Sequence, residues 1–296
     1  MLLTLSTSCL RPLLLGAGSK KAKLDLMDVP RFARDELGLH GLTLSTDLLA
    51  GASRRTLEGL RERADKAACA CLVLSETEVQ PFGSEDPNAG DGAVERTERV
   101  IQAAHILGCN SAAVQVGGAD NDSAFENATD RLKVALERAE KLELNLLITP
   151  TDGLTSRPDR VTELIKAVGR FRMMTFPDFE RASKTDDPVA YLRRLTPYAG
   201  AVCASMVKFS TAEGEDQPDW SALTDRSFEH ETYAIAPLVD AVQSVGFDGA
   251  LALEYRGKGD VTLGLLKCRA MLEAALYDEP DPEPADDDEE DLPDES

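Results

Sequence analysis

The chain lacks the features that mark several large classes of protein. No run of apolar residues approaches the ~18 residues that a membrane-spanning helix requires, so no membrane segment is expected. The six cysteines are scattered, with neither a CxxC pair nor the spacing of a zinc ribbon, which favours reduced, buried thiols in a cytoplasmic protein. Clustered Lys and Arg are missing from an acidic body, which argues against nucleic acid as a partner.

Histidine and glycine-rich loops are also scarce. His40 precedes a predicted strand, His105 lies inside a predicted helix and His230 begins one. Imidazole ligation of a metal and histidine-based nucleophilic catalysis are therefore not expected. The glycine-rich segment that begins at Leu15 shows neither the GxGxxG pattern nor the Walker lysine spacing of a phosphate loop.

Negative charge is abundant and concentrated at the C-terminus. Residues 278–296 hold twelve Asp and Glu and no Lys or Arg, so the net charge of −21 leaves only −9 on the rest of the chain. This segment has almost nothing to bury and is predicted to be a disordered acidic tail. A solvating role is the simpler interpretation, and contact with a basic partner is the alternative.

The apolar N-terminus is predicted to be a strand. It lacks a basic leading region, Arg11 and Pro12 interrupt it, and no small-residue cleavage site follows, so a signal peptide is not favoured.

Short apolar runs alternate with helical patterns over residues 1–277. This alternation predicts a single-domain α/β fold, a (β/α)₈ TIM barrel, with an open doubly wound sheet as the alternative. The predicted strands are 2–8, 41–45, 70–75, 111–116, 144–149, 171–176, 201–207 and 250–255. The predicted helices are 28–37, 54–66, 92–107, 123–142, 158–168, 188–198, 231–245 and 261–276. The loops after the third and seventh strands, 76–91 and 208–230, are predicted to be long, which favours a site at the strand ends.

A carboxylate ends the predicted eighth strand. In period-two alternation Ala250, Ala252 and Glu254 share one face, which places Glu254 at the barrel mouth. A buried charge there requires a partner or a metal. Its alternative role is an ion pair with a nearby cation; the candidates are Lys208, Arg172 and Arg256.

A second carboxylate, Asp178, follows the sixth strand after Pro177. Its alternative role is an Asx turn or a helix cap. Together Asp178 and Glu254 could hold one divalent cation or transfer protons next to a carbonyl. Cys203 shares a strand face with Ser205 and could be a soft ligand, although a buried structural cysteine is the simpler interpretation.

Four motifs carry a family resemblance: 36–42 (ELGLHGL), 176–179 (FPDF), 195–199 (LTPYA) and 246–257 (GFDGALALEYRG). From Leu2 to Leu276 the chain resembles the xylose isomerase-like TIM barrels, the sugar phosphate isomerase/epimerase superfamily. That resemblance implies a divalent metal held by Glu, Asp, His and Glu on strands five to eight. In such enzymes the metal polarises a hydroxy-carbonyl, and two glutamates relay the proton.

Only part of this ligand set is present. Asp178 matches the aspartate and Glu254 the last glutamate, but Thr149 stands at the first glutamate and Cys203 at the histidine. Thr43 stands where a strand-two glutamate is common. The resemblance thus implies a metal site, for Mn, Mg, Co or Zn, that is weak or absent.

Two functions follow from the resemblance. One is an altered isomerase or epimerase of a small hydroxy-carbonyl carbohydrate, with Asp178 and Glu254 catalytic. The other is a catalytically inactive family member that serves as a ligand- or protein-binding module. Under either, the residues expected to contact a small carbohydrate-like ligand are Thr149, Cys203, Ser205 and Glu76. An abasic-site endonuclease would require a histidine-rich zinc cluster and a basic face, which the sequence lacks.

Overall fold

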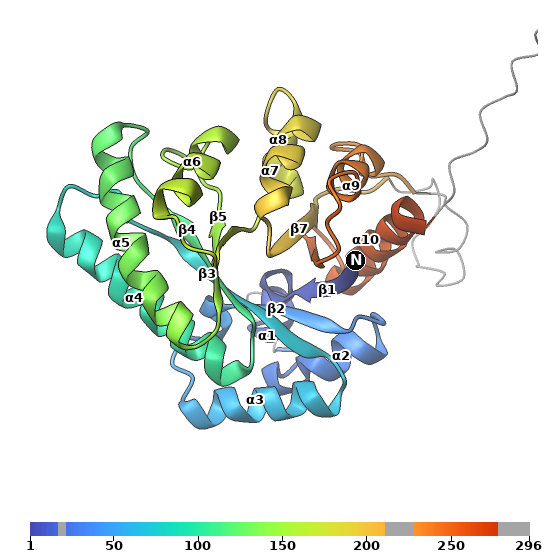
Figure 1. Ribbon diagram of the computed structural model, residues 1–296. Coiled ribbons are helices and arrows are strands. Elements are labelled where there is room, and N and C mark those ends of the chain that lie inside the picture. Colours follow the sequence, from blue (N-terminus) through green and yellow to red (C-terminus); the bar gives the residue numbers. More distant parts are fainter. Residues whose placement is uncertain (17–21, 211–227, 278–296) are drawn as a thin grey trace, which may run out of the picture.

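A barrel of eight parallel strands forms the centre of the molecule, and helices cover its outside (Figure 1). The computed structural model describes residues 1–16, 22–210 and 228–277; the predicted acidic tail lies outside them. The strands are β1 (Leu2–Ser6), β2 (Gly41–Ser45), β3 (Ala70–Gln80), β4 (Ser111–Val116), β5 (Asn145–Thr149), β6 (Met173–Thr175), β7 (Ala201–Met206) and β8 (Ala250–Tyr255). The TIM-barrel prediction is confirmed.

The helices follow the strands in the predicted alternation. They are α1 (Arg11–Leu14), α2 (Val29–Asp35), α3 (Arg54–Lys66), α4 (Pro87–Leu107), α5 (Asp122–Lys141), α6 (Pro158–Val168), α7 (Phe179–Ser183), α8 (Pro188–Leu195), α9 (Ala236–Gln243) and α10 (Val261–Tyr277). Short 3₁₀ turns lie at 7–10, 26–28, 46–49 and 196–198. None of the helices within the described ranges is long and apolar enough to cross a membrane.

Local chemistry explains several helix boundaries. Pro158 and Pro188 begin α6 and α8, where the missing N–H of proline costs no helical hydrogen bond. Asp187 accepts a hydrogen bond from the Ala190 N–H at the start of α8. Gly108 ends α4 with φ of 78°, a left-handed conformation that glycine adopts without strain. These boundaries agree with the sequence prediction.

The barrel closes irregularly between β6 and β7. The regular ladder runs in the order β6-β5-β4-β3-β2-β1-β8-β7, and isolated parallel bridges complete the circle, Thr175 with Ala199 and Asp178 with Cys203. The Cys203 N–H donates to the Pro177 carbonyl at 2.8 Å. This closure puts Asp178 beside the middle of β7.

The core has two layers. Inside the barrel, small and medium side chains pack together, among them Val73, Ala113, Leu147 and Ala252. A larger cluster of buried apolar side chains fills the space between the sheet and the helices. All six cysteines are free and buried, as predicted.

One predicted loop differs from the structure. β3 continues to Gln80 and α4 already begins at Pro87, so the predicted long loop 76–91 was wrong. The register of β3 against β4 shifts between Ser75 and Val79, and this irregularity absorbs residues that the alternation assigned to a loop. Of the predicted loop 208–230, residues 211–227 lie outside the described residues.

Candidate functional site

A cavity of about 170 Å³ opens at the carboxyl ends of the strands. On one side, β2 to β5 supply hydroxyl and amide groups; we call Thr43, Ser45, Ser75, Gln115 and Thr149 the hydroxyl side. On the other, Asp178, Cys203, Glu254 and Arg256 line the cavity from the region of β6 to β8. The predicted site residues Thr149, Cys203, Asp178 and Glu254 are therefore brought together.

Arg256 links the two predicted carboxylates. Its Nε donates to Glu254 Oε1 at 2.8 Å, and its two Nη atoms donate to Asp178 Oδ1 at 3.1 Å and Oδ2 at 2.7 Å. Nη1 also donates to Glu180 Oε2 at 2.8 Å, and Nη2 lies 3.8 Å from Cys203 Sγ. These contacts match the five N–H donors of a guanidinium, so Arg256 has none left for a ligand. We call Asp178, Glu180, Glu254 and Arg256 the ionic cluster.

The fourth carboxylate oxygen, Glu254 Oε2, is also engaged, and Asp178 Oδ1 accepts a second hydrogen bond. Glu254 Oε2 accepts from the Ser6 hydroxyl at 2.7 Å and from the Cys203 thiol at 3.6 Å. Asp178 Oδ1 accepts from the Arg181 N–H at 2.8 Å, which caps α7. Asp178 thus fills its predicted alternative role as a helix cap, and Glu254 fills its predicted alternative role as an ion-pair partner; the ion pair of Asp178 with Arg256 was not predicted.

The electrostatics favour a charged Glu254 carboxylate and a charged guanidinium. Burial raises the pKa of Glu254, but the charge and hydrogen bond of Arg256, together with hydrogen bonds from Ser6 and Ser8, outweigh burial and leave that pKa below its ordinary value. Burial acts to lower the pKa of Arg256, yet the charges of Asp178 and Glu254 raise it overall. Proton release from Arg256 is excluded near neutrality.

Cys203 is a neutral thiol in this setting. Its burial raises the pKa well above the ordinary value, and the negative charges of Glu254 and Asp178 act in the same direction. A thiol that keeps its proton is neither a good metal ligand nor a nucleophile. The simpler interpretation of Cys203, a buried cysteine, agrees with this arrangement.

The hydroxyl side contains buried polar atoms that have no hydrogen-bond partner among the described residues. The Oγ1 atoms of Thr43 and Thr149 are buried and have no hydrogen-bond partner among the residues described. Thr43 is 2% exposed. Gln115 donates to the Thr77 carbonyl at 2.9 Å, which fixes its amide at the cavity rim. Buried hydroxyls without partners cost about 1–3 kcal/mol each, so a ligand with polar groups would be stabilised here.

Two further residues predicted to contact a ligand, Glu76 and Ser205, are bound to other groups of the protein. The Glu76 carboxylate is 1% exposed and accepts from Arg96 Nε at 2.6 Å and from the Thr46 hydroxyl at 3.1 Å. Ser205 is fully buried, and its hydroxyl accepts from the Glu180 N–H at 3.0 Å. Glu76 lines the cavity but is neutralised by Arg96, and Ser205 supports the chain behind the ionic cluster.

The residues present do not fit a divalent cation. Both oxygens of Asp178 and one of Glu254 bind the guanidinium, and the thiol of Cys203 is neutral. Thr149 is a weak ligand compared with a carboxylate. Across the part of the chain that the structure describes, no three His, Cys, Asp or Glu side chains are placed to hold a metal ion.

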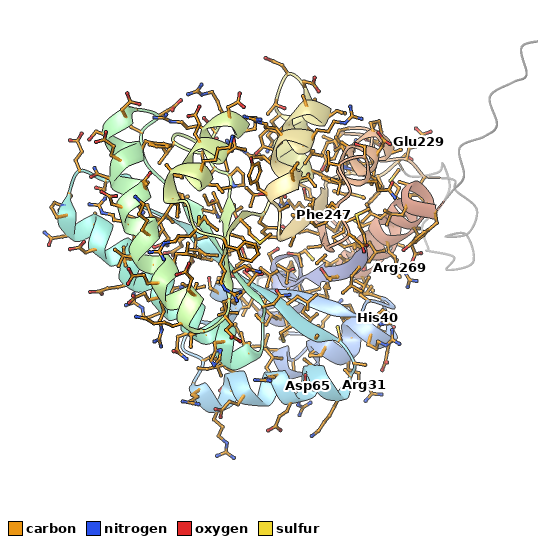
Figure 2. The ribbon with its side chains drawn as sticks, in the orientation of Figure 1. Arg31, His40, Asp65, Glu229, Phe247 and Arg269 are labelled. Carbon is orange, nitrogen blue, oxygen red and sulfur yellow. The ribbon has the colours of Figure 1, made fainter. Side chains whose placement is uncertain are left out.

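His230 was predicted to begin a helix, but it lies beside the carboxyl end of β7. His230 Nε2 accepts from the Val207 N–H at 2.9 Å, just after β7, and α9 begins only at Ala236 instead of position 231. Its Nδ1 lies 2.8 Å from the Tyr233 carbonyl. Both ring nitrogens are used by the backbone, so the role is structural. His40 directly precedes β2 (Figure 2), so it lies at the end of that strand opposite the cavity.

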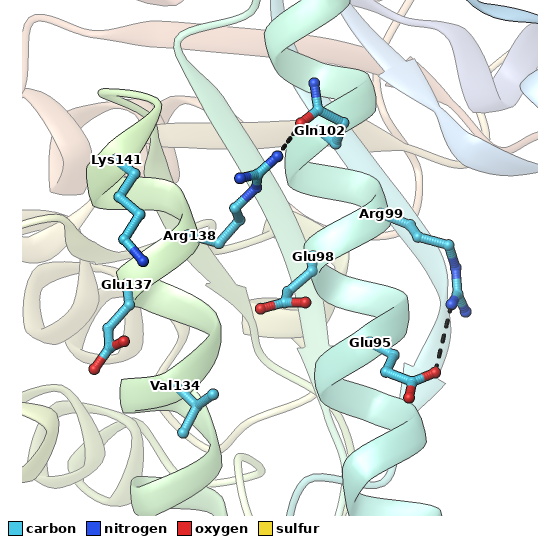
Figure 3. Close-up of a pocket in the computed structure, with 8 residues that line it drawn as sticks. All are labelled: Glu95, Glu98, Arg99, Gln102, Val134, Glu137, Arg138 and Lys141. Carbon is cyan, nitrogen blue, oxygen red and sulfur yellow. Dashed lines mark hydrogen bonds and ion pairs between the residues drawn. The ribbon is translucent and has the colours of Figure 1, made fainter.

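A larger hollow of about 510 Å³ lies on the outer surface between α4 and α5. Figure 3 shows that mostly charged side chains line it. Arg99 and Glu95 form an ion pair at 3.7 Å, and Arg138 donates to Gln102. This hollow has the composition of a solvated helix surface and does not compete with the barrel mouth as a site.

The sequence reasoning missed how the ionic cluster is organised. Arg256 is one of the three cations that the sequence offers as partners of Glu254; of the others, Lys208 pairs with Glu231 and Arg172 donates to the Glu143 carbonyl. The available signal was spacing, because Arg256 is two residues beyond Glu254 and shares its face. The role of Ser6 as a donor to Glu254 had no signal in the sequence.

Comparisons with known proteins agree with this architecture. The family model for xylose isomerase-like TIM barrels matches residues 33–279. A search of curated protein sequences finds no match. Among solved structures, L-ribulose 3-epimerase has a TM-score of 0.71 at 14% identity, over 93% of this chain and 95% of that chain. D-psicose 3-epimerase from Clostridium cellulolyticum, solved with D-tagatose, has a TM-score of 0.67 at 13% identity, over 93% and 97%. IolI protein, solved with a zinc atom, has a TM-score of 0.68 at 12% identity, over 93% and 98%. At these identities the likeness establishes the shared fold.

Proposed function

The chain belongs to the xylose isomerase-like TIM barrel family, and we propose that it binds a small neutral carbohydrate-like molecule at the barrel mouth without isomerising it. The observation that carries this proposal is the division of the cavity. Arg256 holds Asp178 and Glu254, while the hydroxyls of Thr43 and Thr149 have no partner among the described residues. The hydroxyl side therefore supplies the groups that can still form hydrogen bonds with a ligand.

The charge of the site favours a neutral ligand. The ionic cluster contains three carboxylates and one guanidinium, and Arg256 is the only cationic side chain among the described residues that line the cavity. A phosphate or carboxylate ligand would meet net negative charge and no free donor from Arg256. A polyhydroxylated molecule can donate to and accept from threonine hydroxyls.

The size of the cavity limits the ligand as well. Its volume of about 170 Å³ lies below the range of ~300–1,000 Å³ that is common for pockets of drug-sized ligands. A single sugar or a shorter polyol is the size class that the cavity supports.

Proton relay has little support in this geometry. Such chemistry needs a base and a second proton carrier near the substrate carbons. Thr149 replaces one of the carboxylates implied by the family pattern, and Glu254 accepts hydrogen bonds from Arg256, Ser6 and Cys203. Catalysis would require Glu254 to give up these hydrogen bonds and a second proton carrier to be supplied, whereas binding without turnover requires neither.

Ligand-observed NMR tests the binding proposal. Neutral ketoses, aldoses and short polyols, and phosphate esters of the same sugars, are titrated into protein that has been treated with a chelator. We expect saturation transfer to at least one neutral compound and none to its phosphate ester. Thr43→Val and Thr149→Val should each weaken binding by roughly tenfold, because each removes one hydrogen bond of about 1.4 kcal/mol.

Thr97→Val is the matched control. Thr97 on α4 is also fully buried with no partner for its hydroxyl, but it does not line the cavity. Its substitution should leave ligand binding unchanged. Wild-type affinity in both Thr43→Val and Thr149→Val would contradict the proposal.

The isomerase alternative has a separate signature. Transfer of a carbon-bound proton exchanges it with solvent, so a bound sugar incubated in D₂O would gain deuterium. We expect no incorporation, and we expect Glu254→Ala to keep ligand binding largely intact. Deuterium gain by the wild type that is lost in Glu254→Ala would establish the isomerase instead.

A further inference from the structure

The guanidinium of Arg256 occupies the space between Asp178 and Glu254, the two carboxylates that match the family's metal ligands. It lies 2.7 Å from Asp178 Oδ2 and 2.8 Å from Glu254 Oε1. We propose that Arg256 is the resident cation of this site: it replaces a divalent metal, and it is the residue that determines that the barrel binds no such metal. This inference goes beyond ligand binding and does not depend on the identity of the ligand.

The charges of the ionic cluster require a cation. Asp178, Glu180 and Glu254 have side chains that are 11%, 21% and 14% exposed, and each binds Arg256. Carboxylates with so little access to water are costly unless they are paired. Removal of the guanidinium would leave Asp178 and Glu254 without a cation, and Glu180 with only the exposed Lys184.

The same carboxylates would supply the oxygen ligands that Mn²⁺ and similar ions accept. The oxygens that bind Arg256 come from Glu254 on β8, from Asp178 at the N-cap of α7, and from Glu180 in α7, so they approach the guanidinium from two different elements. Without Arg256 these oxygens would be free to bind an ion, and the Cys203 sulfur lies on the same side. Arg256 and a divalent ion therefore compete for one set of ligands.

Nearby cations do not share this role. Arg181 binds Asp152 at 2.7 Å, and Asp152 is 95% exposed. Lys184 binds Glu180 at 2.7 Å, but its side chain is 68% exposed and it touches neither Asp178 nor Glu254. Neither contact places a charge between the two inner carboxylates.

Metal binding by single-residue variants tests the proposal. Chelator-treated wild type, Arg256→Ala, Arg256→Lys and Arg181→Ala are titrated with Mn²⁺, and free Mn²⁺ is measured by electron paramagnetic resonance. We expect Arg256→Ala to bind one Mn²⁺ at least about 100-fold more tightly than the wild type, as expected when a buried ion pair loses its cation. Arg181→Ala removes an equal charge from the same end of the barrel and should behave as the wild type. Arg256→Lys keeps a cation and should bind Mn²⁺ far more weakly than Arg256→Ala.

Two results would overturn the inference. One is stoichiometric Mn²⁺ retained by the wild type, and the other is a folded Arg256→Ala with wild-type Mn²⁺ affinity. Should Arg256→Ala not fold alone, refolding with and without Mn²⁺ replaces the titration. Recovery only with Mn²⁺ supports the inference, and recovery that does not depend on Mn²⁺, or none at all, counts against it. Failure of the sugar titrations would leave these outcomes unaffected, so the two proposals can fail separately.

Discussion

At the scale of single residues, the barrel mouth is governed by which donors and acceptors are already used. Arg256 uses its N–H groups on Asp178, Glu180, Glu254 and Cys203, whereas the hydroxyls of Thr43 and Thr149 remain without partners among the described residues. The difference decides where a ligand gains hydrogen bonds. It also separates stability, which depends on the ionic cluster, from recognition, which depends on the hydroxyl side.

His230 gives a prediction for pH dependence at this scale. Burial lowers its pKa, against opposing effects from the Tyr233 carbonyl and Glu231. Its Nε2 accepts from the Val207 N–H, so protonation would break that hydrogen bond. Because the folded pKa lies below the unfolded value, His230 contributes stability that is present at pH above the unfolded pKa and lost as the pH falls.

Chemical denaturation over about pH 7.5 to 5.5 checks this prediction. The free energy of unfolding of the wild type should fall over this range, and that of His230→Gln should fall less. The pKa values of Glu254 and Glu180 lie below their ordinary value, so these two carboxylates do not obscure the effect. Equal slopes for the two proteins would show that His230 is not held neutral by its contacts.

The sequence predicted which residues reach the mouth better than it predicted what they contact. Period-two alternation and the family motifs placed Thr149, Asp178, Cys203 and Glu254 at the strand ends, and the structure gathers them around one cavity. The partner of Glu254 depends on the direction of a long arginine side chain, which local pattern does not determine. Glu76 was unpredictable for another reason, because the register shift in β3 decides which way it faces.

At the scale of elements, most boundaries followed from local chemistry. Proline at the start of α6 and α8 and glycine after α4 were visible in the sequence. The predicted end of β3 and the predicted start of α4 were wrong. Asn88, Gly90 and Gly92 are residues typical of loops, and they hid the first turns of α4 in the sequence. Tertiary contacts hold that start: Arg131 on α5 donates to the Phe82 and Ser84 carbonyls at 2.7 and 2.6 Å.

The two glycines of α4 predict opposite effects. A Cβ on Gly92 would meet nothing within 4 Å, so Gly92→Ala should stabilise the protein by about 0.5–1 kcal/mol through lower chain entropy in the unfolded state. A Cβ on Gly90 would lie 1.9 Å from Arg131 Cζ. Gly90→Ala should therefore displace the guanidinium from its two carbonyls and destabilise by about 1–2 kcal/mol.

Urea denaturation of both variants beside the wild type measures these changes. Since the two substitutions are identical and lie in one helix, the difference between them isolates the contact with Arg131. Similar stabilisation by both would mean that the guanidinium moves aside without loss, and that it does not hold the start of α4.

At the scale of the whole molecule, strand order produces the division of the cavity. β2 to β5 are neighbours in the sheet and carry the hydroxyl side, while β8 and the irregular closure between β6 and β7 bring the ionic cluster together. The isolated bridge between Asp178 and Cys203 sets the position of Asp178 opposite Glu254. The barrel was predictable from the eightfold alternation, but this closure was not, because it depends on pairing across residues distant in sequence.

The central claim is that Arg256, and no divalent metal, pairs with the carboxylates of the barrel mouth. A crystal structure of the wild type grown with Mn²⁺ and measured at the manganese absorption edge tests it most directly. We predict a guanidinium in contact with Asp178 and Glu254 and no anomalous peak between them. An anomalous peak bound by these two carboxylates, with Arg256 turned away, would contradict the claim.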